Sequence, residues 1–90
     1  MKNGWITDSN GTKRHYVDDK YHNDNGPAII WEDGTKYWAK HGNKHREDGP
    51  AIEWSDGEKE WWYEGKRLGH ALDGYTQEKF EQWLKFRAFL

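Results

Sequence analysis

A step of 23 residues recurs along the chain and limits the folds that it can adopt. Residues of one type recur at this step as Gly11, Gly34 and Gly57, as Lys13, Lys36 and Lys59, and as Ile6, Ile29 and Ile52. Tryptophans follow the same step, Trp31 with Trp54 and Trp38 with Trp61. A repeat of this length is one supersecondary unit, which buries its apolar residues only by stacking on its neighbours. The sequence therefore predicts a repetitive fold.

The repeats divide a single domain of 90 residues into consecutive units. These units are a degenerate first repeat at 4–22, a second repeat at 23–45, a third at 46–68 and a partial repeat at 69–75. The last segment, TQEKFEQWLKFRAFL at 76–90, contains neither glycine nor proline and departs from the pattern. A chain of this length can bury one small core.

Each repeat is typical of a β-hairpin. Asn10-Gly11, Asp33-Gly34 and Asp56-Gly57 are the dipeptides that two-residue type I′ turns prefer, because both central residues of such a turn have positive φ. We therefore expect turns at these three glycines. The fold class that follows is mainly β with one helix, an antiparallel meander of three hairpins.

The expected turns also predict which side chains share a face of the sheet. A two-residue loop at Asp33-Gly34 would place Ile29 opposite Trp38 and Trp31 opposite Lys36. Lys36 and Lys59 would then lie across Trp31 and Trp54 as cation–π partners. The face that carries these residues would be apolar, and the reverse face would be free for a partner.

The segment 76–90 is predicted to be an amphipathic helix. Thr76 suits the N-cap and Glu78 suits the first turn. Apolar residues follow helical spacing at Phe80, Trp83 and Leu84, with Ala88 and Leu90 near the same side.

We expect this helix to fold over the Trp38/Trp61 face, because an uncovered single-layer sheet would expose a large aromatic patch. A homodimer is the alternative cover. The predicted structural core is Ile29, Trp31, Trp38, Ile52, Trp54, Trp61, Phe80, Trp83 and Leu84.

Two phrases, DGTKYWAKHGN and DGEKEWWYEGK, resemble a known family. They are similar to MORN (membrane occupation and recognition nexus) repeats, particularly the bacterial and viral variant with a G-x-x-x-W-Y-x-x-G pattern. The resemblance covers Gly4 to Gly74, and the phrase HREDGPA resembles small accessory proteins of tailed phages. It implies a meander of hairpins without shared catalytic chemistry. It also implies action in the bacterial cytoplasm, as an inhibitor of a host defence factor or as an antitoxin-like protein.

Composition argues against several function classes. The 14 basic and 16 acidic residues give a net charge of −2, so there is no overall attraction to nucleic acid or anionic membranes. The chain has no cysteine, no apolar run of membrane-spanning length, and neither a G-x-S-x-G nor an H-E-x-x-H motif. We expect a cytoplasmic protein that is not an enzyme, has no cofactor and does not contact a membrane.

Histidines recur at His22, His45 and His70. Side-by-side hairpins would hold such histidines about 10 Å apart, twice the spacing of strands, whereas zinc ligands lie about 2 Å from one ion. We therefore expect these residues to stabilise turns, and we expect no metal site.

Candidate partner-binding residues are aromatic and basic side chains outside the predicted core: Trp5, Arg14, Tyr16, Tyr37, Arg46, Trp62 and Arg67. Aromatic anchors with an arginine rim are typical of protein–protein interfaces. The favoured function is a small protein that binds and occludes a host protein.

Two alternative functions stay open. One is RNA binding, including RNA-dependent inhibition of a ribonuclease toxin, because aromatic platforms with basic side chains bind single strands. The other is an oligomeric structural module.

Overall fold

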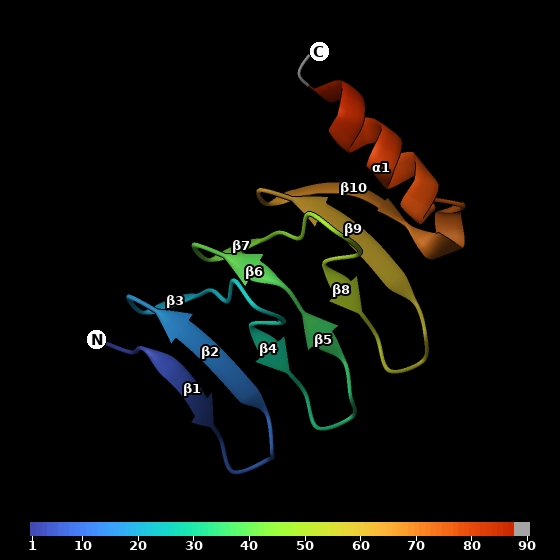
Figure 1. Cartoon of the computed structure of the whole chain (residues 1–90). Helices are drawn as coiled ribbons and strands as arrows, with labels where there is room; N and C mark the ends of the chain where they lie inside the picture. Colours follow the sequence, from blue (N-terminus) through green and yellow to red (C-terminus); the bar gives the residue numbers. More distant parts are fainter. Residues whose placement is uncertain (88–90) are drawn as a thin grey trace.

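The protein, described by a computed structural model for residues 1–87, is a single layer of antiparallel strands with a helix at one end (Figure 1). Its extents are 42 × 29 × 17 Å, so it is thin in one direction. The predicted fold class, mainly β with a C-terminal helix, is confirmed. The predicted helical residues Ala88 and Leu90 lie outside the described residues.

Eight strands form the main sheet in the order β1–β2–β4–β5–β8–β9–β10, with β3 paired to β2. Their bounds are β1 (Gly4–Thr7), β2 (Lys13–Val17), β3 (Lys20–Tyr21), β4 (Ile29–Ile30), β5 (Lys36–Tyr37), β8 (Ile52–Glu53), β9 (Lys59–Tyr63) and β10 (Lys66–His70). A second, small hairpin consists of β6 (Ala39–Lys40) and β7 (Asn43–Lys44). A 3₁₀ turn, η1 (Ala71–Asp73), leads to the helix α1 (Gln77–Phe86).

The Asp-Gly turns are not the predicted two-residue type I′ turns. Gly34 has φ +93°, but Asp33 does not have positive φ. The Gly34 N–H donates to the Trp31 carbonyl at 3.0 Å, and the Trp31 N–H donates to the Thr35 carbonyl at 2.9 Å. These bonds close a three-residue loop whose last residue is left-handed, a conformation that favours glycine. The turns at Gly11 and Gly57 have the same hydrogen bonds and φ near +90°.

Type I′ geometry occurs instead at the opposite ends of the hairpins. Both central residues have positive φ at His41-Gly42 and at Glu64-Gly65, and also at Asp18-Asp19. Four of these six central residues are neither glycine nor asparagine, which are the residues that type I′ turns usually have.

The extra loop residue moves the hairpin register by one position and changes which side chains share a face. Ile29 pairs with Tyr37 and Ile30 pairs with Lys36, so the predicted pairing of Ile29 with Trp38 is wrong. Lys36 consequently lies on the opposite side of the sheet from Trp31. The third repeat has the equivalent register, in which Ile52 pairs with Glu60. The predicted lysine–tryptophan cation–π pairs are therefore also wrong.

The observed register defines two faces. We call the face with Ile29, Trp31, Tyr37, Ile52, Trp54 and Trp62 the open face. We call the face with Ile30, Lys36, Trp38, Lys59, Trp61 and Tyr63 the helix face. The predicted single apolar face was thus a mixture of both, with Trp31 and Trp54 on one side and Trp38 and Trp61 on the other.

The helix begins after the predicted N-cap, Thr76, whose hydroxyl accepts a hydrogen bond from the Lys79 N–H at 3.2 Å. It packs on the β9 end of the helix face. The Trp61 indole N–H donates to the Gln77 side chain at 2.9 Å, and Trp83 lies edge-on to Tyr63 with ring centroids 5.2 Å apart.

The helix was predicted to cover both Trp38 and Trp61, but it covers only Trp61. Trp38 is covered by a different side chain. The Arg46 guanidinium lies 3.8 Å from the centre of the Trp38 ring. Figure 1 shows α1 beside β9 and β10, at the far end of the sheet from β1.

The buried hydrophobic core is Ala28, Ile29, Ala39, Ala51, Ile52, Trp61 and Phe80. The other predicted core residues, Trp31, Trp38, Trp54, Trp83 and Leu84, are half-buried. Sequence reasoning missed the three alanines.

Two buried histidines stabilise turns, as predicted. The His22 Nδ1 accepts a hydrogen bond from the His41 N–H at 2.9 Å, and the His45 Nδ1 accepts one from the Glu64 N–H at the same distance. Each ring therefore fixes the first residue of the next type I′ turn. His70 acts in the same way on η1, where its Nδ1 accepts from the Leu72 N–H at 3.0 Å.

Candidate functional site

The most distinctive surface feature is a groove on the open face, about 400 Å³ in volume. Its lining residues are Trp31, Asp33, Thr35, Tyr37, Ile52 and Trp54. The groove follows from the repeat, because the step of 23 residues places Trp31 and Trp54 at equivalent positions in neighbouring hairpins. Thr35 lies between the two tryptophans on the intervening strand and is only 7% exposed.

Each of the two tryptophan rings contacts another aromatic side chain. Trp31 meets Tyr37 edge-on, with ring centroids 6.1 Å apart. Trp54 lies against His70, with centroids 5.6 Å apart. Both indoles are half-buried, and the space between them remains open to solvent.

The groove has one charged lining residue, Asp33. Its carboxylate accepts hydrogen bonds from the Thr35 N–H at 2.9 Å and from the Ser55 hydroxyl at 3.4 Å. The bond from the Thr35 backbone is the main reason that the pKa of Asp33 lies below its usual range. The carboxylate is therefore ionised at neutral pH, and no lysine or arginine is among the described residues that line the groove.

A second aromatic cluster continues the open face beyond Tyr37. The Lys44 ammonium lies 4.2 Å from the centre of the Trp62 ring and 5.8 Å from that of Tyr37. Tyr16 and Tyr21 pack together on the same side, with centroids 5.2 Å apart. The open face thus carries aromatic side chains from all three repeats.

The arginines of the open face are paired with acids. Arg14 donates to the Asp8 carboxylate, and this bond lowers the pKa of Asp8. Arg67 lies 3.6 Å from the Glu60 carboxylate and 3.7 Å from that of Asp73.

The structure brings most of the predicted partner-binding residues together. Five of them lie on the open face: Arg14, Tyr16, Tyr37, Trp62 and Arg67. Trp5 lies on the other face beside His15 and is 48% exposed. Arg46 covers Trp38 on the helix face. The sequence analysis assigned Trp31 and Trp54 to the core because its predicted hairpin register differs by one residue from the observed register.

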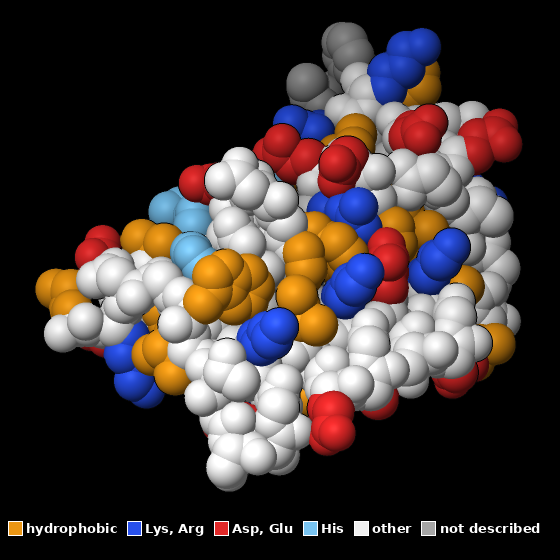
Figure 2. All heavy atoms as spheres, turned by 60° about the horizontal axis from the view of Figure 1, so that its bottom comes forward, with side chains coloured by type: hydrophobic (Ala, Val, Ile, Leu, Met, Phe, Trp, Pro, Cys, Tyr) orange, Lys and Arg blue, Asp and Glu red, His pale blue; other side chains and the backbone are white. Residues whose placement is uncertain are grey.

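The helix face differs in character from the open face. Across the strands, the register aligns a row of side chains consisting of Lys13, Ile30, Lys36, Glu53 and Lys59. Figure 2 shows a face of the molecule on which basic side chains alternate with hydrophobic and acidic ones in this way. The alternation leaves no purely basic surface along this row.

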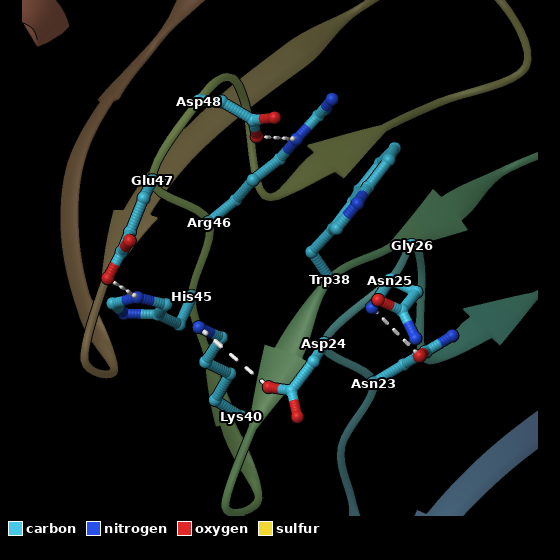
Figure 3. A pocket seen from close by; sticks show the side chains of 10 residues that line it. All are labelled: Asn23, Asp24, Asn25, Gly26, Trp38, Lys40, His45, Arg46, Glu47 and Asp48. Carbon is cyan, nitrogen blue, oxygen red and sulfur yellow. Dashed lines mark hydrogen bonds and ion pairs between the residues drawn. The ribbon is translucent and has the colours of Figure 1, made fainter.

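A larger hollow of about 450 Å³ lies between the second and third repeats, around Trp38 and Arg46 (Figure 3). Its charged groups satisfy one another. Arg46 donates to Asp48 at 2.8 Å, and Lys40 lies 3.9 Å from Asp24. Arg46 stacks on Trp38 and so joins the two repeats, and the residues that line the hollow offer no unpaired cation.

Within residues 1–87, no three histidine or carboxylate side chains are grouped so that they could hold a metal ion. None of the described helices has the length and apolarity needed to cross a lipid bilayer. Comparisons with protein-family models, with curated proteins and with solved structures found no match.

Proposed function

We propose that this protein is a non-catalytic binding module that holds a partner protein on its open face. The observation that supports this most is the pair of unequal faces. The helix packs on Trp61 and Tyr63 of one face, whereas Trp31, Tyr37 and Trp54 of the other are half-buried and border an open groove. Half-buried aromatic side chains on a rigid surface are the usual anchors of protein–protein interfaces.

The electrostatics of the open face favour a protein partner over RNA. Single-stranded RNA binding combines aromatic platforms with basic side chains that are free to contact phosphates. Here Arg14 and Arg67 are paired with carboxylates, and Asp33 places a negative charge in the groove. A phosphate backbone would be repelled by this charge in the groove between Trp31 and Trp54.

The resemblance to phage repeat proteins supplies the proposed biological setting. In that setting the partner is a host defence factor or toxin, and the protein inhibits it by covering its surface. The type I′ turns held by His22 and His45 and the thin sheet suit such a role, because a preformed surface loses little conformational entropy on binding.

Affinity capture from bacterial lysate tests the proposal. The full-length chain is compared with a Tyr37→Ala/Trp62→Ala variant and with a matched control, Trp5→Ala, which removes an exposed tryptophan from the opposite face. We expect a captured protein to be lost with the double variant and retained with the control. Circular dichroism confirms that both variants are folded.

Two results would contradict the proposal. Capture that disappears after ribonuclease treatment, and that weakens log-linearly with salt, would identify RNA as the ligand. Self-association at micromolar concentration on a sizing column, abolished by the Tyr37→Ala/Trp62→Ala variant, would identify the open face as an oligomer interface instead.

A further inference from the structure

We infer that the groove between Trp31 and Trp54 binds the guanidinium group of an arginine side chain of the partner protein. This inference rests on the proposed function and specifies the chemistry of the partner at one position. It is supported by the width of the groove, by its charge, and by an equivalent contact elsewhere in the same chain.

The width of the groove suits a planar group. Trp31 and Trp54 are separated by the strand of Thr35, so their Cα atoms lie about 10 Å apart, twice the strand spacing. A flat group stacked between two rings needs about 3.5–4 Å on each side, or roughly 7–8 Å in total. The groove, with a volume of about 400 Å³, has room for one planar group above Thr35.

The charge of the groove suits a cation. Asp33 is the charged group that lines it, and its two oxygens each accept one hydrogen bond within the chain. A carboxylate oxygen has two lone-pair sites, so both oxygens of Asp33 can accept a further bond from the paired N–H groups of a guanidinium.

Planarity favours arginine over lysine. A guanidinium stacks on aromatic faces and donates two parallel hydrogen bonds to a carboxylate, whereas an ammonium group is a compact, strongly hydrated charge. The chain itself contains this arrangement. Arg46 stacks 3.8 Å from the centre of the Trp38 ring while donating to Asp48 at 2.8 Å. The groove presents the same pair of partners, a tryptophan and an aspartate, without an internal arginine.

An NMR titration of the full chain tests the inference, with N-acetyl-arginine amide as the probe. We expect the indole N–H signals of Trp31 and Trp54 to shift, and those of Trp61 and Trp62 to stay. N-acetyl-lysine amide should bind more weakly, and adenosine monophosphate should not bind the groove. Tighter binding of adenosine monophosphate than of the arginine probe would overturn the inference in favour of a nucleotide.

A pair of matched variants isolates the charge. Asp33→Asn keeps the acceptor for the Thr35 N–H and removes the charge. We expect this variant to bind the arginine probe about twofold to fivefold more weakly, because an exposed ion pair contributes this much to binding. Asp56→Asn makes the same change at the equivalent position of the next repeat, where the carboxylate accepts from the Glu58 N–H at 3.0 Å and lies outside the groove. It should bind the probe as the unmodified chain does. Equal affinities of the two variants would overturn the inference.

The probe titration and the capture experiment can fail separately, so each tests a different claim. If capture depends on Tyr37 and Trp62 but the arginine probe does not shift Trp31 and Trp54, the binding face stands and the arginine inference is wrong. If the probe binds in an Asp33-dependent manner but capture is unaffected by the open-face variant, the groove binds a cation and the proposed function is wrong.

Discussion

Replacing His45 by phenylalanine should destabilise the protein even though the ring is kept. The His45 side chain is nearly inaccessible, at 5% exposure, and its ring stacks on Tyr63 with centroids 4.5 Å apart. Its Nδ1 accepts the Glu64 N–H at 2.9 Å, and its Nε2 lies 3.3 Å from the Glu47 carboxylate. Phenylalanine preserves the stacking and removes both polar contacts.

The magnitude follows from the part-buried hydrogen bond to Glu64. A typical hydrogen bond contributes about 0.5–1.5 kcal/mol, and a buried donor that is left unpaired costs about 1–3 kcal/mol. Glu64 has φ +48°, a conformation that a residue with a side chain adopts only when its surroundings hold it there. We therefore expect His45→Phe to lower the free energy of unfolding by about 1–2 kcal/mol. In a domain of this size, that corresponds to a fall in Tm of roughly 4–16 °C.

Urea denaturation followed by tryptophan fluorescence measures this loss, and hydrogen exchange locates it. The Glu64 amide should exchange faster in the variant, while the equivalent amide of the second repeat, His41, should keep the protection that His22 gives it. A matched control is His41→Phe, which changes an exposed histidine. If His45→Phe is as stable as the unmodified chain and the Glu64 amide stays protected, the turn-fixing role of the buried histidines is wrong.

Three further predictions follow from the turns, the ion pairs and the helix. Gly34→Ala should lower the free energy of unfolding by about 1–2 kcal/mol in urea denaturation, because φ is +93° and an added Cβ meets nothing within 4 Å, so backbone strain is the sole cost. The hydrogen bond from Arg14 lowers the pKa of Asp8 in the folded protein. The stabilising contribution of Asp8 is therefore present above its unfolded pKa of about 3.9 and is lost as pH falls through the folded pKa. In thermal denaturation, the unmodified chain should be more stable than Asp8→Asn at pH 7, and this difference should shrink towards pH 2. Phe80→Ala should cost about 3–5 kcal/mol, since this ring is 0% exposed, and should reduce the helical circular dichroism signal; unchanged helicity would show that α1 does not depend on packing against the sheet.

Local signals predicted the elements of this fold well. The step of 23 residues indicated consecutive hairpins, and Thr76 indicated where the helix begins, because both signals depend on residues close in sequence. Thr76 caps the helix through its own side chain, so no distant partner was needed to find it.

The assignment of faces failed for a physical reason. An Asp-Gly dipeptide suits a two-residue type I′ loop, and it equally suits a three-residue loop whose final glycine is left-handed. Asp33-Gly34 adopts the second form, and the difference of one residue transfers Trp38 to the opposite side from Trp31. The cover of Trp38 could not be predicted from the repeat either, because the position of Arg46 in the third repeat is Asn23 in the second.

The proposed binding face requires Trp31 and Tyr37 to lie on the same side of the sheet, and proton–proton distances from NMR test this directly. With ring centroids 6.1 Å apart in an edge-on arrangement, Trp31 and Tyr37 should give cross-peaks between their ring protons. Trp31 should give none to the side chain of Lys36, which lies across the sheet. Cross-peaks from Trp31 to Lys36, together with cross-peaks from Ile29 to Trp38, would mean that the hairpin has the other register and that the open face does not exist.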